Sequence, residues 1–284
     1  MILCVRTPNS PDLLITQNTL KTHVSTAADS GLRFRRKILY LQSLNVDSSK
    51  ALHKNPNLRS APLSAVQSIA QCLASMGLDP VDVGRILDMH PELLTSDPYT
   101  EIYPIFDFLL NTVRIPFHEI RKSIIRCPRL LVSDLEAQLK PTFEFLTRFG
   151  FSGRNRITSR TSLLLVSSIE FTLIPKIEYL LGLGLKHGEV KNMVLRSPGL
   201  LTFSVENNFM PKVDYFLNEM NGNIEEIKDF PQYFSYSLER KIKPRHRLLM
   251  KHRFSMPLWE MLKVSDGEFN AQLIEKRLEM APEV

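Results

Sequence analysis

Arginines and lysines recur at fixed distances from a short proline motif, and cations at such spacing can bind the phosphates of a nucleic acid. The motif is Pro-x-Leu-Leu, as at Pro91, Pro128 and Pro198. Two residues before a motif position stand Arg126, Arg160 and Arg196; six before stand Arg85, Lys122 and Arg156; seven before stand Arg121 and Lys191. One residue after a second, later proline stand Lys176, Lys212 and Arg245.

Charge is also concentrated along the chain. The net charge is +6. Residues 121–160 hold nine bases against three acids, and residues 240–253 hold seven bases and no acid, whereas residues 79–107 hold seven acids and one base. The residues predicted to bind nucleic acid are Arg121, Lys122, Arg126, Arg129, Arg156, Arg160, Lys176, Lys191, Arg196, Lys212, Lys241, Lys243, Arg245, Arg247 and Lys251.

Two other interpretations of these charges stay open. Any single base can simply occupy the solvated face of an amphipathic helix, although a set in register favours a common ligand. Alternatively, the chain is a helical-repeat scaffold that binds a protein partner without touching nucleic acid. The acidic segment 79–107 is then the expected docking surface.

The elements that position these cations form an internal repeat. Motif positions follow one another at spacings of 35, 37, 34, 36 and 33 residues, at Pro56, Pro91, Pro128, Ser162, Pro198 and Pro231. A second proline lies 13 residues after each of the five later positions, at Pro104, Pro141, Pro175, Pro211 and Pro244. Two markers in phase over five units indicate a repeat protein.

Each repeat is predicted to be a helix, a turn and a second helix. The motif proline ends one helix, because proline removes a hydrogen bond and clashes with the preceding turn. The leucines that follow then turn back over the core. Serines four to six residues after the motif position suit helix caps or a short 3₁₀ turn, at Ser96, Ser133, Ser167, Ser204 and Ser235. The predicted fold is all-α, a solenoid of about six to seven such repeats with short 3₁₀ turns.

The ends of the chain do not follow the repeat. Residues 1–31 hold eight Ser or Thr and two acids, which is typical of an organelle transit peptide or a disordered segment. The repeat domain is expected over residues 32–269, where Leu258, Trp259, Met261 and Leu262 form a last apolar helix, and an acidic tail over residues 270–284. No stretch is long and apolar enough to predict a membrane span.

An enzyme is the least favoured class. Cys4, Cys72 and Cys127 are odd in number and far apart, so they predict neither a disulfide framework nor a metal site. The Gly182-Leu183-Gly184 sequence follows a helical pattern and lacks the strand that a dinucleotide loop requires. We expect no catalytic residues, no metal, no cofactor, and a monomer.

The repeat resembles the mitochondrial transcription termination factor (mTERF) family. The likeness rests on the Pro-x-Leu-Leu motif, the second proline, the period near 35 and the closing Val264-Ser265-Asp266-x-x-Phe269, and it covers about Arg33 to Phe269. It implies a left-handed superhelix with a 3₁₀ turn per repeat. It also implies nucleic-acid binding in organelles, in transcription termination or pausing, or in RNA processing and splicing. Residues 33–46 resemble plastid members, which favours chloroplast over mitochondrion.

The residues and the resemblance together predict an organellar nucleic-acid-binding protein with a basic groove. Side chains that recur once per repeat follow a phosphate backbone better than they read bases. Pentatricopeptide-type RNA binding fits less well, because its code needs polar residues at fixed positions and those flanking the motif here are mixed. The expected partners are organellar DNA or RNA, or both.

Overall fold

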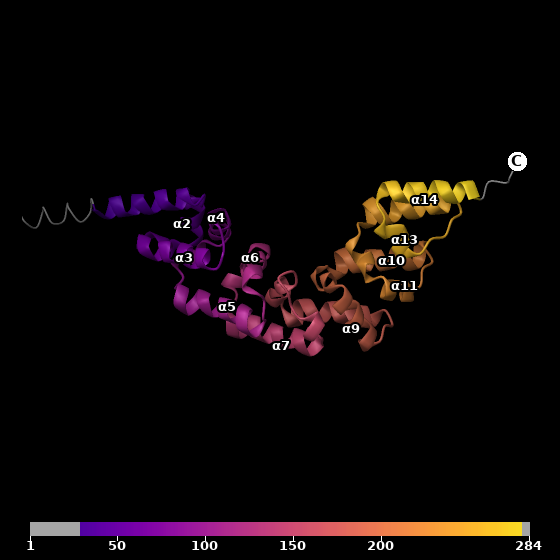
Figure 1. Ribbon diagram of the computed structural model, residues 1–284, viewed down its shortest axis with the longest axis horizontal. Helices are drawn as coiled ribbons and strands as arrows, with labels where there is room; N and C mark the ends of the chain where they lie inside the picture. The colour runs from indigo at the N-terminus through magenta and orange to yellow at the C-terminus, as the bar shows by residue number, and fades with distance from the viewer. Residues whose placement is uncertain (1–28, 280–284) are drawn as a thin grey trace, which may run out of the picture. The chain divides into compact units, whose positions relative to one another are not determined.

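The computed structural model describes residues 29–279 and divides the chain into two compact units, unit 1 up to Val132 and unit 2 from Ser133. The predicted repeat domain therefore contains a boundary that its regular spacing does not reveal. Most of the predicted N-terminal segment, residues 1–28, lies outside the described part. Helices and turns make up both units, and the described residues contain no strand (Figure 1). The predicted all-α class is confirmed.

Unit 1 begins with a helix over residues 29–43 and continues through short helices. The α-helices are α2 (Ser48–Lys54), α3 (Leu63–Ser75), α4 (Pro80–Met89), α5 (Tyr103–Asp107) and α6 (Phe117–Arg126). Between them lie the 3₁₀ turns η1 (Pro56–Arg59), η2 (Pro91–Thr95) and η5 (Pro128–Val132), and the π turns η3 (Pro98–Ile102) and η4 (Phe108–Thr112).

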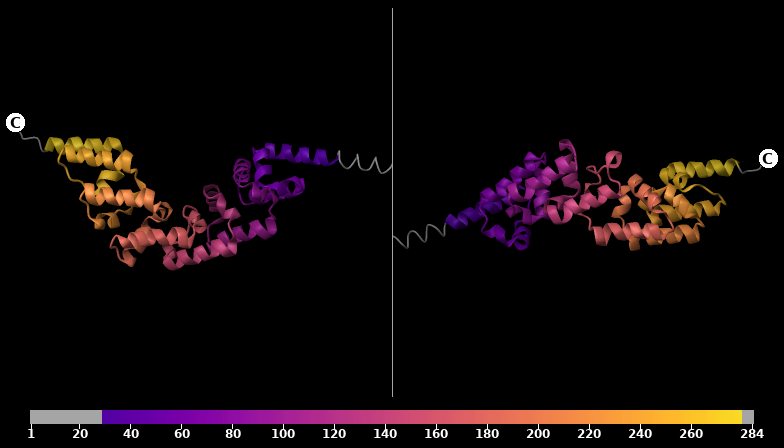
Figure 2. Two further views of the ribbon diagram at one scale, coloured as in Figure 1. Left: turned by 180° about the vertical axis from the view of Figure 1, so that it is seen from behind. Right: turned by 90° about the horizontal axis from the view of Figure 1, so that it is seen from below.

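Unit 2 repeats the same order and ends in α14, which closes its C-terminal end (Figure 2). The α-helices are α7 (Lys140–Phe149), α8 (Ile174–Gly182), α9 (His187–Arg196), α10 (Met210–Asp214), α11 (Ile224–Asp229), α12 (Lys243–Lys251), α13 (Leu258–Lys263) and α14 (Asp266–Glu279). The 3₁₀ turns are η7 (Gly153–Asn155), η8 (Ser162–Val166), η10 (Pro198–Thr202) and η13 (Pro231–Ser235). The π turns are η6 (Leu135–Leu139), η9 (Ile169–Leu173), η11 (Val205–Phe209), η12 (Tyr215–Glu219) and η14 (Leu238–Ile242).

A 3₁₀ turn begins at every motif position, including Ser162, which lacks the proline. The turn directs two side chains inward: Leu130 and Leu131 are buried in η5, and Leu200 and Leu201 in η10. Full burial stabilises each such side chain by about 1.5–3 kcal/mol. The 3₁₀ turn predicted for each repeat is therefore present at each of the six positions.

The helix after each of the five later turns is capped six residues past the motif position, whereas Pro62 before α3 provides no side-chain cap. The side chain there accepts a backbone N–H in each of the five repeats, at Asp97, Asp134, Ser168, Ser204 and Ser237. Of the predicted serines only Ser204 is such a cap. Ser96, Ser133, Ser167 and Ser235 lie one or two residues too early, because the 3₁₀ turn occupies the motif and one extended residue must follow it before the helix begins.

The second proline lies inside a continuous helix, and a π turn precedes it in all five repeats. In unit 2 the residue two before the proline donates to the carbonyl five residues back, as from Leu139 N to Asp134 O at 3.0 Å and from Phe209 N to Ser204 O at 3.2 Å. An unmodified α-helix would bring the proline ring against a carbonyl four residues earlier. The wider turn lets the helix pass through the proline.

One repeat has no second α-helix. Residues 150–161, called here the 150–161 segment, contain only the 3₁₀ turn η7 and loops. Its composition explains this, because Gly, Ser, Thr and Asn favour turns over helix, and Gly153 takes a positive φ of 57°. Ile157 is the one branched aliphatic residue of the segment, and it is buried. The predicted helix-turn-helix unit is therefore wrong for this repeat.

Three buried or half-buried lysines tie the first helix of one repeat to the 3₁₀ turn of the next. Lys37 Nζ donates to the carbonyls of Leu58 at 2.5 Å and Arg59 at 3.0 Å. Lys176 Nζ donates to Leu201 O at 2.6 Å, and Lys212 Nζ to Phe234 O at 2.6 Å. The carbonyls at the C-terminal end of a 3₁₀ turn carry partial negative charge and lack a donor of their own. A cation at this position satisfies them.

The C-terminal boundary differs from the prediction. The expected tail from residue 270 begins inside α14, which continues to Glu279, and Leu273 is buried against unit 2. Arg245, only 3% exposed, donates to Met261 O and Asp266 Oδ1 at 2.5 Å each and lies 4.7 Å from the Phe269 ring. These contacts attach α14 to α12.

We predict that Leu201→Ala lowers the free energy of unfolding by about 2–5 kcal/mol, because it leaves a cavity in a fully packed site. Chemical denaturation monitored by circular dichroism measures the change. Leu217→Ala is the matched control, since Leu217 is 37% exposed and its truncation costs much less. Equal losses for the two variants would contradict the packing role of the motif leucine.

Lys212 predicts a dependence of stability on pH. It is 6% exposed, and burial lowers its pKa from 10.5 to about 8. Between these values the unfolded chain binds more protons than the folded one, so stability should rise as pH increases from about 8 to 10.5. Lys212→Met should remove this rise. If the unfolding free energies of the two proteins change with pH in the same way, the pKa of Lys212 does not differ between the folded and the unfolded chain.

Candidate nucleic-acid interface

The predicted cations divide into exposed and buried sets. Exposed side chains belong to Arg121, Lys122, Arg126, Arg129, Arg156, Arg160, Lys191, Arg196, Arg247 and Lys251. Lys176, Lys241 and Lys243 are half-buried, and Lys212 and Arg245 are buried. Register in the sequence therefore does not by itself place a cation on the surface.

The row after the second proline has a structural role. Lys176, Lys212 and Arg245 are occupied by carbonyls of the next 3₁₀ turn or helix. Lys241 likewise donates to Val264 O at 3.2 Å. A phosphate could reach Lys212 only by displacing packed side chains. This row was predicted to bind nucleic acid, and we remove it from the candidate interface because its N–H groups are already used inside the repeats.

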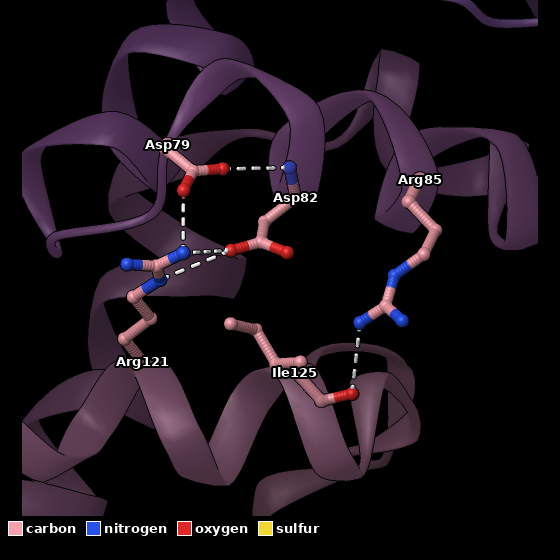
Figure 3. Close-up of polar contacts among 5 residues, drawn as sticks. All are labelled: Asp79, Asp82, Arg85, Arg121 and Ile125. Atoms are coloured by element: carbon pink, nitrogen blue, oxygen red, sulfur yellow. Dashed lines mark hydrogen bonds and ion pairs between the residues drawn. The ribbon is translucent and has the colours of Figure 1, made fainter.

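Arg121 is neutralised by two acids of the preceding repeat. Its guanidinium contacts Asp79 and lies 2.8 Å from Asp82 Oδ2 (Figure 3). The hydrogen bond with Asp82 raises the pKa of Arg121. Asp79 caps α4, since its carboxylate accepts from the backbone N–H of Asp82 at 3.0 Å. The ion pair joins α4 to α6, and Arg121 offers less positive charge to a ligand than its exposure implies.

Two further arginines bind the C-terminal carbonyls of the next repeat's second helix. Arg85 Nη2 donates to Ile125 O at 3.1 Å, at the end of α6 (Figure 3). Arg196 donates to the carbonyls of Lys228 and Asp229, at the end of α11. Cations at a helix C-terminus interact favourably with its dipole. Both side chains remain exposed on one side, so a phosphate could share them only in competition with these carbonyls.

The acidic segment 79–107 is also committed internally. Asp88 binds Lys50 at 2.5 Å, which lowers the pKa of Asp88, and Glu92 binds His90 at 2.9 Å. Asp97 caps η3, and the Glu101 carboxylate accepts from the backbone N–H of Asp97 at 2.9 Å. Asp107 accepts from the Asn111 amide at 2.7 Å. All seven acids therefore have partners within unit 1, which weakens the case for a free acidic docking surface.

The 150–161 segment holds the clearest group of unpaired cations. Arg154, Arg156 and Arg160 are exposed, and among the described residues their guanidinium groups have no hydrogen-bond or ion-pair partner. No acid occurs between Glu144 and Glu170. Lys191 of α9 extends past this segment, because its Cε would lie 2.6 Å from a Cβ added at Gly150. Arg154 was noted as a base in the sequence but left out of the predicted site.

A hollow of about 520 Å³ adjoins this segment. It is bounded by Asn155, by Asn192 and Arg196 of α9, and by Lys228 and Asp229 of α11. Lys228 also pairs with Glu189 at 3.1 Å. The segment and the two second helices thus enclose a polar surface on which extended backbone phosphates could lie.

A second cationic hollow, in unit 1, was not predicted. It has a volume of about 430 Å³, and its walls include Phe34 and the bases Arg33, Arg36, Lys37 and Arg59. The helix over residues 29–43 and the turn η1 bring these bases together. Sequence reasoning missed them because Arg36 and Arg59 share no position in the repeat register.

Acids occupy their own rows on the first helices of unit 2. Eight residues after the motif positions stand the exposed Glu136, Glu170, Glu206 and Glu239; sixteen after stand the exposed Glu144, Glu178 and Asp214. Three of these acids, Glu136, Glu144 and Glu239, pair with bases of the same helices. The first helices of unit 2 therefore carry both charges, whereas the 150–161 segment carries bases alone. These rows of acids could have been recognised from the sequence, because the acids recur at fixed distances from the motif just as the bases do.

Residues 29–279 contain neither a candidate metal site nor a candidate membrane span. No three His, Cys, Asp or Glu side chains there are grouped so that they could hold a metal ion. None of the helices in that range is both long and apolar enough to cross a membrane.

The family model named mTERF matches residues 109–270, more than half of the chain. Transcription termination factor MTERF2, chloroplastic, of Arabidopsis thaliana is 30% identical over 133 residues, which are 46% of this chain and 21% of that protein. MTERF4, chloroplastic, of Oryza sativa subsp. japonica is 31% identical over 101 residues, 36% and 20% of the two chains. MTERF8, chloroplastic, of Arabidopsis thaliana is 23% identical over 260 residues, 74% and 49%.

This chain thus spans between a fifth and a half of the length of these relatives. The resemblance predicted from the proline motifs is confirmed, and the relatives' names support the predicted chloroplast localisation.

We predict that Arg196→Gln lowers the free energy of unfolding by about 0.5–1.5 kcal/mol, because two carbonyls at the end of α11 lose their donor. Arg156→Gln, at an exposed arginine without a partner, should change it by less than about 0.5 kcal/mol. Urea denaturation of both variants measures the difference. If Arg196→Gln leaves the free energy of unfolding unchanged, Arg196 does not stabilise the end of α11 and its charge is available to a ligand.

Proposed function

Because the chain belongs to the mTERF family, we propose that it regulates gene expression in the chloroplast by binding nucleic acid directly, mainly through phosphates. Names of relatives refer to transcription termination. For this chain we propose that it acts either at transcription or in processing of the transcript. The proposed contact residues are Lys122, Arg126, Arg129, Arg154, Arg156, Arg160, Lys191 and Arg196.

One observation carries the proposal: the 150–161 segment exposes three arginines that have no partner within residues 29–279. Elsewhere in the repeats, Arg121 and the buried Lys212 are neutralised or used as hydrogen-bond donors. A guanidinium can bind a phosphate with two parallel hydrogen bonds, and it stays charged at any physiological pH. Three such groups on one short segment can contact neighbouring phosphates of one strand.

The rows of acids support the same orientation. Glu170 and Glu206 lie on the first helices of unit 2, form no ion pair within the described residues, and would repel phosphates there. The strand would then lie on the side of unit 2 formed by α9, α11 and the 150–161 segment. Binding through phosphates positions the chain on a nucleic acid and contributes little sequence selectivity.

We predict that Arg156→Gln/Arg160→Gln weakens binding of a chloroplast DNA or RNA fragment. The slope of log affinity against log salt should fall by about 1.4–1.8, because two phosphate contacts each contribute about 0.7–0.9. Fluorescence anisotropy at several salt concentrations measures both quantities. The matched control is Lys140→Gln/Arg148→Gln, which removes the same charge from bases paired with Glu136 and Glu144 on α7.

Equal weakening by the two double variants would mean that net charge alone, and not the 150–161 segment, controls binding. If the unmodified chain binds neither DNA nor RNA at low salt, direct contact is excluded and the scaffold alternative remains. If the chain does bind, crosslinking and sequencing of the nucleic acid bound to it in isolated chloroplasts would distinguish action at transcription from action in RNA processing.

A further inference from the structure

A small pocket of about 350 Å³ lies in unit 2 between α11, the turn η13 and α13. Its walls include Asp229, Phe230 and Gln232 on one side and Pro257, Trp259 and Lys263 on the other. It is separate from the 150–161 segment, none of whose residues lines it. Glu226 also lines it, so its walls combine an aromatic face, one base, two acids and one amide.

Trp259 is the only tryptophan in the chain, and it is 54% exposed. On the same helix Leu258, Met261 and Leu262 are buried and account for the packing of α13. Trp259 therefore does not belong to the core, although its sequence position in an apolar helix predicted that it would. Within the described residues, neither its indole N–H nor the Gln232 amide has a hydrogen-bond partner. Both are free to bind a ligand.

Alternating cations and rings hold the pocket wall in place. Lys263 Nζ lies 5.6 Å from the Phe230 ring, and Phe230 stacks on Tyr236 with centroids 6.2 Å apart. Lys241 Nζ lies 4.8 Å from the Tyr236 ring on the far side and donates to Val264 O. Because these contacts restrain Lys263 and Phe230, the pocket is largely formed before a ligand arrives.

We propose that this pocket binds an unpaired nucleobase of a single-stranded nucleic acid, with the base stacked on Trp259. The Gln232 amide and the Asp229 carboxylate reach the base edge, where they can accept from exocyclic amino groups and donate to ring acceptors. Lys263 contacts the adjoining phosphate. The carboxylate disfavours a phosphate inside the pocket itself, which leaves the base as the part that fits.

A duplex does not offer this ligand, because its bases are stacked and paired inside the helix. Single-stranded segments present their faces, and aromatic side chains bind them with little dependence on sequence. The basic tract of residues 240–253 precedes α13 and would attract the strand to this end of unit 2. This inference rests on the proposed function and specifies its ligand as containing a single-stranded region.

The single tryptophan gives a direct test. Trp259 fluorescence of the whole chain is measured during titration with a mixed-sequence single-stranded RNA of about 12 nucleotides, with the single-stranded DNA of the same sequence, and with their duplexes. Anisotropy of labelled probes measures affinity in parallel. We expect quenching by the single strands, and no quenching by the duplexes even where anisotropy shows that they bind.

Substitution completes the test. Trp259→Ala should weaken single-strand binding about fivefold or more while duplex binding stays unchanged, and Trp259→Phe should retain much of the affinity. Phe171→Ala removes an aromatic side chain that is 85% exposed elsewhere in unit 2 and should have no effect. Circular dichroism spectra check that each variant is folded.

The outcomes separate the two proposals. Single strands that bind without quenching, or quenching by duplexes as strong as by single strands, would overturn the pocket assignment and leave phosphate binding by the 150–161 segment intact. No binding of any probe would overturn the proposed function itself.

Discussion

The carbonyls at the end of each buried 3₁₀ turn constrain the rest of the structure. Each turn places two large apolar side chains in the core, and in doing so it points unpaired carbonyls at the preceding repeat. Lys37, Lys176 and Lys212 supply the missing donors. At Thr142 no cation is present, and Gln138 Nε2 instead donates to Ser167 O at 2.9 Å. At three of the six motif turns a lysine side chain is therefore drawn inward by the turn carbonyls, and at a fourth an amide takes its place.

This constraint decides which charges are free. A cation in register with the turn is drawn inside, and one in register with a helix end, such as Arg196, binds that end. Arg121 pairs with acids of its neighbour. Three bases without partners are grouped where the repeat itself is irregular, because an irregular segment has neither a helix end nor a facing acid to satisfy. The 150–161 segment is such a place.

The two candidate binding features differ in kind and complement each other. The 150–161 segment offers arginines without partners, which suit the uniform charge of a phosphate backbone. The Trp259 pocket offers a stacking face at the irregular C-terminal end of the repeats, which suits a base. Loops and chain ends of repeat proteins are free to vary because they do not carry the packing between repeats. Function can therefore reside there without loss of the core.

The sequence by itself determined the repeat, its motif positions, the all-α class and the family, because proline and paired leucines act through local backbone geometry and burial. It also contained the cap at motif position plus six and the acidic rows, although only Ser204 was identified in advance. Tertiary structure alone decided that Lys212 is buried, that Arg121 is neutralised, that residues 150–161 form no helix and that Trp259 lines a pocket. These depend on contacts between repeats, and a side chain's partner about 35 residues away is not visible in its own local pattern.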